Sequence, residues 1–143
     1  MLNAVVNQHA MRPALVSGER IITYAELSAR VNILAAELAR RGIRPGDRVS
    51  LLLRNTPEFV IGYLAIATAG ALAVPLNDHY QQTELRYFID ECSVTLLLTA
   101  ESFRPVFENV LPQTKAHCQL LLVESWNELK PDDSWRAPVL DPD

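Results

Sequence analysis

An uncharged run of 19 residues, 59–77 (FVIGYLAIATAGALAVPLN), places the strongest constraint on how this chain can fold. About 20 apolar residues are enough to cross a bilayer, so one interpretation is a transmembrane span. The other is a buried helix that ends at Gly70, followed by a buried strand over residues 72–76. Gly70 is typical of a helix C-terminus, whereas Pro75 does not suit the end of a span. We therefore expect a helix and a strand at the centre of a soluble α/β core.

The residues just before this run mark the start of its helix. Thr56 offers a capping hydroxyl, Pro57 suits the first helical turn, and Glu58 places an acid near the positive end of the helix dipole. Farther along, Tyr63 and Tyr87 fall on apolar helix faces, so we expect both in the core.

The best-marked helix of the sequence begins at Thr23. Thr23 and Glu26 have the spacing of a capping box, and Ile22 and Leu27 are placed to pack across it. A buried stripe follows at helical spacing, made of Leu27, Val31, Leu34 and Leu38. Gly42 then ends the helix.

Strand-like and helix-like segments alternate along the chain. We expect helices at residues 23–41, 56–70, 82–92 and 102–111, and strands at 49–53, 72–76, 94–98 and 119–123. This alternation predicts an α/β fold with a parallel sheet of at least four strands between helical layers.

The two ends of the chain carry weaker patterns. A short amphipathic helix is expected at residues 3–11, and residues 14–16 and 21–22 flank a turn-like segment, which predicts a small N-terminal hairpin. We assign residues 1–128 to a single α/β domain and residues 129–143, rich in proline and aspartate, to an exposed linker or tail.

Charge and cysteine content narrow the class of protein. The net charge of -4 argues against a nucleic-acid partner, which usually leaves a basic patch. Cys92 and Cys118 are isolated, which indicates a reducing compartment without a disulfide framework. The N-terminus lacks the layout of a signal peptide, so we expect a cytoplasmic protein.

The residues alone reveal no complete active site. GxGxxG, GxxxxGK[ST], GxSxG and HExxH are all missing, and the five glycines are not clustered. His9, His79 and His117 are scattered, and each is expected to be a surface or packing histidine. No catalytic residue and no metal ligand is assigned.

A resemblance adds what the residue pattern does not contain. TYAEL (23–27), GDRVSLLLRNTPEFVIGYLAIATAGALAVPLN (46–77) and TELRYFIDECSVTLLLTA (83–100) resemble the N-terminal part of AMP-forming acyl-CoA synthetases, of the adenylate-forming superfamily. The resemblance implies the first subdomain of such an enzyme. It also implies that the full-length enzyme joins a carboxylic acid to coenzyme A, using ATP and Mg.

The family's reactive segments do not occur in this sequence. They are a Ser/Thr/Gly-rich phosphate loop, an aromatic-Gly-x-Thr-Glu segment, a Thr-Gly-Asp ribose contact and a C-terminal lysine; residues 138–143 resemble the linker before the phosphate loop. We therefore expect an N-terminal fragment that is inactive alone. Its partner would be the missing C-terminal part of the ligase or a self-associating copy, so that a homo-oligomer is expected.

One residue is a candidate ligand contact. In some acid–CoA ligases a basic residue just after the PLN segment approaches a coenzyme A phosphate, and His79 stands near that place, next to Asp78. A plain surface loop is the alternative. Two other functions remain open for the whole chain: a standalone binding module derived from the family, and an unrelated small α/β protein of the flavodoxin or receiver type.

Overall fold

The computed structural model describes residues 2–115 and 117–139. Its helices are α1 (Leu2–His9), α2 (Tyr24–Arg40), α3 (Pro57–Thr68), α4 (Gln82–Glu91) and α5 (Arg104–Val110). Its strands are β1 (Pro13–Ser17), β2 (Arg20–Thr23), β3 (Arg48–Leu52), β4 (Leu72–Pro75), β5 (Leu96–Thr99) and β6 (Gln119–Leu122). Short 3-10 helices lie at η1 (Glu101–Phe103), η2 (Leu111–Gln113) and η3 (Val123–Glu128). The predicted helices and strands are all present, with bounds within about two residues of those expected.

The central sheet has four parallel strands in the order β4-β3-β5-β6. Val49 on β3 lies opposite Ala73 on β4 and opposite Leu96 on β5, and Leu98 on β5 lies opposite Leu121 on β6. The parallel sheet between helical layers is therefore confirmed. The chain first crosses from β3 to β4 on one side of β3, and the later strands β5 and β6 lie on the other side of β3.

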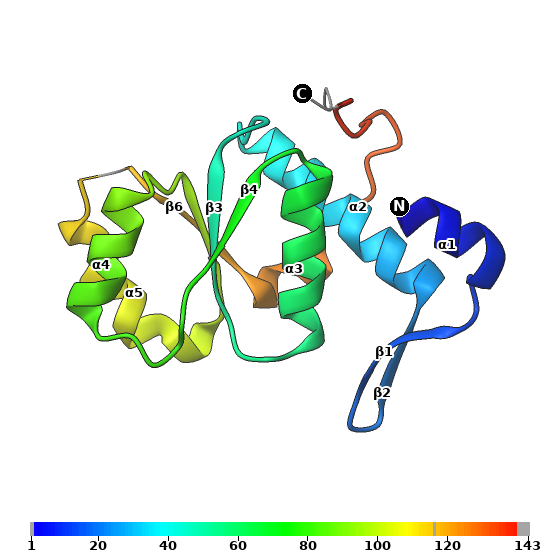
Figure 1. Ribbon diagram of the computed structural model, residues 1–143, viewed down its shortest axis with the longest axis horizontal. Coiled ribbons are helices and arrows are strands. Elements are labelled where there is room, and N and C mark those ends of the chain that lie inside the picture. Colours follow the sequence, from blue (N-terminus) through cyan, green and yellow to red (C-terminus); the bar gives the residue numbers. More distant parts are fainter. Residues whose placement is uncertain (1, 116, 140–143) are drawn as a thin grey trace.

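Each face of the sheet carries its own hydrophobic core (Figure 1). One core joins the sheet to α2 and α3, and the other joins it to α4 and α5. The first is centred on fully buried residues such as Leu34, Leu38, Leu51 and Ile66. The second contains Leu97, Ile89 and Phe107. Alternate residues of β5 supply the two cores, as expected for a strand that is covered on both faces.

Gly62 allows α3 to lie directly against the sheet. A Cβ atom at this position would lie 2.8 Å from Leu51 Cδ2 and 3.4 Å from both Leu98 Cδ1 and Trp126 Cη2. These distances are at or below van der Waals contact, so the space that a side chain would need is already filled. The uncharged run therefore forms a helix and a strand, α3 and β4, with Gly70 at positive φ just after the helix. No helix among residues 2–115 and 117–139 is long and apolar enough to cross a membrane.

The two predicted helix starts have different outcomes. Thr23 caps α2 as expected: its backbone N–H donates to Glu26 Oε2 at 2.8 Å, and its Oγ1 accepts from the Glu26 backbone N–H at 3.3 Å. At α3 the helix does begin with Pro57, but the Thr56 side chain makes no capping hydrogen bond. The prediction of a hydroxyl cap at Thr56 is therefore wrong.

The predictions that Tyr63 and Tyr87 are core residues are also wrong. The two side chains are 46% and 59% exposed. In α3 apolar residues surround the whole helix, so periodicity cannot tell which face meets the sheet. In α4 the buried positions are Leu85 and Ile89, and Tyr87 lies between them in sequence and therefore points away.

The N-terminal hairpin projects from the body of the molecule (Figure 1). β1 and β2 pair antiparallel and join no other strand of the described chain. Val16 lies opposite Ile21 across the hairpin, and the two side chains are 67% and 59% exposed. The predicted hairpin is present, and it presents an apolar pair to solvent.

The segment after β6 returns to the face that carries α2 and α3. Trp126 in η3, and then Leu129 and Trp135, pack against the first core while remaining partly exposed. The charged residues between them, such as Asp132 and Asp133, are exposed. The boundary between a domain at 1–128 and a tail at 129–143 stays a prediction, and its last residues, 140–143, lie outside the described part.

Candidate functional site

A cavity of about 550 Å³ lies at the carboxyl edge of the sheet. Three loops that are distant in sequence meet there: Leu53 and Arg54 follow β3, Ala100 and Phe103 follow β5, and residues 123–129 follow β6. Helices α2 and α3 and the tip of the hairpin complete its wall. The cavity has the size of a small-molecule site.

The interior of this cavity is apolar. Its lining includes the buried side chains of Leu34, Leu53, Ile61 and Phe103. The ring of Trp126 contributes a further, half-buried wall. The position of Trp126 depends on α3, because its Cη2 atom occupies space beside Gly62. A flat or extended apolar group would therefore find apolar contacts on several sides.

Charged side chains surround the opening of the cavity. Arg20 donates to Glu58 Oε1 at 2.7 Å, which couples the hairpin to the start of α3. Burial of Glu58 raises the pKa of its carboxyl, but the hydrogen bonds from Arg20, from its own backbone N–H and from Thr56, together with the charge of Arg20, outweigh burial, so the pKa lies below its usual value. Glu124 Oε1 accepts the backbone N–H of Glu101 at 3.0 Å. Both acids are therefore held by donors of the protein itself.

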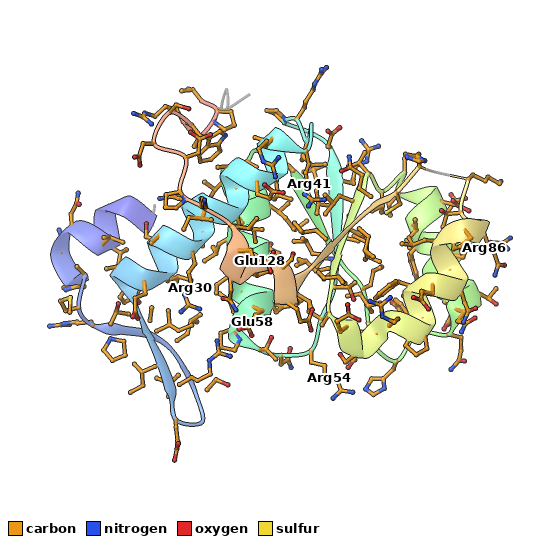
Figure 2. The ribbon with its side chains drawn as sticks, turned by 180° about the vertical axis from the view of Figure 1, so that it is seen from behind. Arg30, Arg41, Arg54, Glu58, Arg86 and Glu128 are labelled. Carbon is orange, nitrogen blue, oxygen red and sulfur yellow. The ribbon has the colours of Figure 1, made fainter. Side chains whose placement is uncertain are left out.

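Two further arginines at the opening have no carboxylate within hydrogen-bonding distance in the described chain, although the charge of Arg30 interacts with the carboxyl of Glu26. Among the described residues neither Arg30, on α2, nor Arg54, after β3, makes a hydrogen bond or an ion pair with a carboxylate. The guanidinium of Arg54 lies over the ring of Phe103, 6.0 Å from its centroid. In Figure 2 the labels of Arg30, Glu58 and Arg54 follow one another from the left toward the middle of the molecule. Three arginines and two glutamates line the cavity, so its excess charge is one positive unit.

His79 lies outside this cavity. It follows β4 in an exposed loop, with its side chain 89% exposed. Its backbone N–H donates to Asn77 Oδ1 at 2.9 Å, and its Nε2 lies 3.7 Å from Asp78 Oδ1. The contact between His79 and a coenzyme A phosphate stays a prediction.

The other candidate groups offer no reactive centre. Burial raises the pKa of the Cys118 thiol to about 12, so at neutral pH it is protonated and a poor nucleophile. The described residues hold no group of three or more His, Cys, Asp or Glu side chains placed to bind a metal ion. The four glycines with positive φ, at Gly18, Gly42, Gly46 and Gly70, belong to separate turns.

Sequence reasoning did not find the cavity. Arg30 and Arg54 are 24 residues apart, and nothing in their local sequence distinguishes them from the other arginines. The available signal was topological, because parallel strands bring the loops at their carboxyl ends together. The sequence predicted a parallel sheet but no strand order, so it did not show which loops meet.

Comparison with known proteins places the chain among much longer enzymes. It is 35% identical over 117 residues to a medium/long-chain-fatty-acid–CoA/3-oxocholest-4-en-26-oate–CoA ligase of Mycobacterium marinum. This match covers 82% of this chain and 21% of the ligase. It is 36% identical over 101 residues to a 3-hydroxybenzoate–CoA ligase of an Aromatoleum species, covering 71% of this chain and 19% of that enzyme. The chain thus spans about a fifth of the length of these relatives, and it corresponds to their N-terminal part.

Solved structures have the same fold. The o-succinylbenzoate CoA synthetase of Bacillus subtilis superimposes with a TM-score of 0.79 at 26% identity, covering 92% of this chain and 33% of that one. The N-terminal subdomain of NpsA from Klebsiella oxytoca superimposes with a TM-score of 0.81 at 24% identity, over 99% of this chain and 34% of that one. A family model described as AMP-binding enzyme matches residues 2–142. The chain belongs to the AMP-binding enzyme family.

Proposed function

We propose that this chain supplies the N-terminal scaffold of an acyl-CoA ligase and forms no acyl-adenylate by itself. The observation that carries the proposal is the extent of the match: the family resemblance covers nearly the whole chain, yet only 21% of a ligase relative. The phosphate loop and the C-terminal lysine of such ligases have no counterpart in the sequence.

The complete ligase would act on a carboxylic acid with ATP, Mg and coenzyme A. The names of the relatives support this reaction class, and those of medium/long-chain-fatty-acid–CoA ligases support a role in fatty acid metabolism. His79 would approach a coenzyme A phosphate, since it is exposed in the loop after β4. A cytoplasmic location is proposed on the two free cysteines.

Adenylation requires the triphosphate to be held while a carboxylate attacks its α-phosphorus. Most of the barrier reduction in such a step comes from positioning and from stabilising the developing charge. Among the described residues four glycines lie in separate turns and Gly62 lies in α3, so no glycine-rich loop there offers several backbone amides to one phosphate group. The two lysines, Lys115 and Lys130, are exposed and lie in a loop and in the segment after η3.

The direct test is ATP–pyrophosphate exchange with purified protein. Short, medium-length and aromatic acids are each added with ATP and Mg, and a complete acyl-CoA ligase serves as the positive control. We expect no acid-dependent exchange above the background without enzyme. Acid-dependent exchange by this chain, in preparations free of host ligases, would disprove the proposal.

A complementation test examines the scaffold role separately. The Mycobacterium marinum ligase, shortened to lack the part that matches this chain, is expressed alone and together with this chain. If the chain is a scaffold for the rest of a ligase, co-expression restores soluble protein or activity that the shortened ligase lacks. A copy of the chain that carries Leu51→Asp, which destroys the core beneath α3, is the matched negative control. Equal results with the wild-type chain and this control would contradict the scaffold role.

A further inference from the structure

We propose that the cavity at the carboxyl edge of the sheet is a binding site for an amphipathic organic anion. Its apolar body would lie against Phe103 and Trp126, and its anionic head group would lie between Arg30 and Arg54. The residues that line the cavity come from α2, α3, the hairpin and the loops after β3, β5 and β6. Occupancy of the cavity therefore requires neither ATP nor Mg, and it does not depend on the scaffold function proposed above.

The topology of the sheet gives the first argument. The chain leaves β3 toward the face that carries α3, and it leaves β5 toward the face that carries α5. β3 and β5 are neighbours, so their two loops diverge and leave a crevice between Leu53 and Phe103. In open α/β sheets, ligands bind at such a switch point, outside the carboxyl ends of the strands. The cavity lies at this switch point.

The charge at the opening selects an anion. The Arg20–Glu58 pair neutralises itself, whereas the guanidinium groups of Arg30 and Arg54 make no hydrogen bond within the described chain. Glu26 interacts with the charge of Arg30 from outside the cavity lining and offsets it only in part. Some other arginines of the chain are engaged: Arg48 donates to the backbone oxygens of Cys92 and Ser93, and Arg104 pairs with Glu101 and Glu108. A planar guanidinium with unused donors matches the oxygens of a carboxylate, sulfonate or phosphate group.

The cavity wall selects the body of the ligand. Leu34, Leu53 and Ile61 are at most 7% exposed and form a fixed apolar surface, while Phe103 and Trp126 add aromatic rings. The Arg54 guanidinium over the Phe103 ring places a positive charge next to that apolar surface. A ligand with an apolar body and one anionic head would make both kinds of contact at once. A small inorganic anion would make only one of them.

The binding test uses three naphthalene probes of nearly equal size and shape. They are 2-naphthoate and naphthalene-2-sulfonate, which are anions, and 2-naphthol, which is neutral at pH 7. Calorimetric titration without ATP or Mg should give one site per chain for both anions, with a dissociation constant on the order of 0.1 mM. We expect 2-naphthol to bind at least about fivefold more weakly, since it lacks the charge-assisted hydrogen bonds. If only one of the two anions binds, the head group is identified as the carboxylate or the sulfonate.

The site of binding is read from the indole N–H signals of the two tryptophans. Trp126 lines the cavity and Trp135 does not, so each anion should shift the Trp126 signal far more than the Trp135 signal. A Trp135→Phe variant assigns the two signals. The Trp135 signal therefore serves as an internal control within the same molecule.

Charge-matched variants test the role of the arginines. Arg30→Gln and Arg54→Gln change exposed side chains, so the fold should be retained, and each should weaken anion binding about fivefold or more. Arg86→Gln removes one positive charge from the exposed surface of α4 and should leave binding unchanged. In Figure 2 Arg86 lies at the right-hand end of the molecule, whereas Arg30 lies left of the middle and Arg54 lies between the two.

Four results would overturn the proposal. They are an absence of binding by either anion up to 5 mM (about 50 times the expected dissociation constant), equal affinity for 2-naphthol, a shift that is larger at Trp135 than at Trp126, and an equal loss of affinity in Arg86→Gln. A dimer that dissociates in Arg30→Gln, in the absence of anion binding, would show instead that a second copy occupies the cavity. The comparison of probes on the wild-type chain decides the question even if a variant fails to fold.

Discussion

Replacing Gly62 by alanine tests how closely α3 lies against the sheet. Glycine in a helix interior is normally about 1 kcal/mol worse than alanine, so at an exposed site this change would stabilise the protein. Gly62, however, is buried. The added Cβ would lie 2.8 Å from Leu51 Cδ2, although carbon atoms normally approach to about 3.5–4.0 Å. Leu51 and Leu98 are 0% exposed, so neither has free space into which to move.

The two effects have opposite signs and can be compared. Overpacking a filled core costs about 1–3 kcal/mol, which outweighs the gain of about 1 kcal/mol in helix propensity. We expect Gly62→Ala to lower the free energy of unfolding by about 1 kcal/mol. The measurement is the midpoint of urea unfolding, provided that the m-value is unchanged. In the double variant Gly62→Ala/Leu51→Val, the smaller side chain should relieve the clash, so its loss should be less than the sum of the single losses.

An exposed alanine provides the calibration. Ala29 lies on the solvent side of α2, and Ala29→Gly should cost about 1 kcal/mol through propensity alone. If Gly62→Ala instead stabilises the protein by the amount that Ala29→Gly destabilises it, the close approach of α3 to Leu51 is refuted.

Four further predictions concern caps, polar groups and exposed surface. Thr23→Ala removes the α2 cap and should lower the free energy of unfolding by about 1 kcal/mol, and an unchanged melting curve would show that the cap is not formed. Ser50 is fully buried and its Oγ has no hydrogen-bond partner among the described residues. Ser50→Ala should therefore leave the free energy of unfolding, measured by chemical denaturation, unchanged or raise it by up to about 1 kcal/mol. A decrease of more than about 1 kcal/mol would contradict this. Glu37 accepts from Arg40 and Arg41, and although burial raises the pKa of its carboxyl, these hydrogen bonds hold the pKa below the usual 4.5. Its contribution is therefore complete above pH 4.5 and is lost as the pH falls through the lowered pKa, so the stability deficit of Glu37→Gln, about 1–2 kcal/mol at pH 7, should disappear in acid rather than persist. The isolated chain should self-associate in light scattering through apolar surface such as the hairpin, and Val16→Thr should reduce this, whereas a wild-type monomer at high concentration would contradict the prediction.

Local sequence signals were enough to predict most of the fold. The capping box at Thr23 and Glu26 defines the start of α2, and Gly70 defines the end of α3, because both depend on neighbouring backbone groups. The failure at Thr56 has a local cause as well: Pro57 begins the helix without help from the hydroxyl. The tyrosine predictions failed since a helix that is apolar on all sides gives no periodic signal for Tyr63.

The candidate cavity could not be predicted in the same way. Arg30, Arg54 and Trp126 come from a helix and two loops, and only the strand order brings them together. A sequence that alternates helices and strands predicts a parallel sheet but permits several strand orders. The switch point between β3 and β5, and therefore the cavity, depends on which order is formed.

The pairing of the central strands has a consequence for how such an enzyme is made. In the described part of the chain, strands β3 to β6 pair with one another, and the whole sheet lies within about 75 residues of sequence, from Arg48 to Leu122. Both cores are also closed by helices of the same segment, α2 to α5. A ribosome that translates a long ligase would thus release these four strands together, each with at least one pairing partner present. The segment could fold while the nucleotide-binding part is still being synthesised, and it would offer that part a preformed surface.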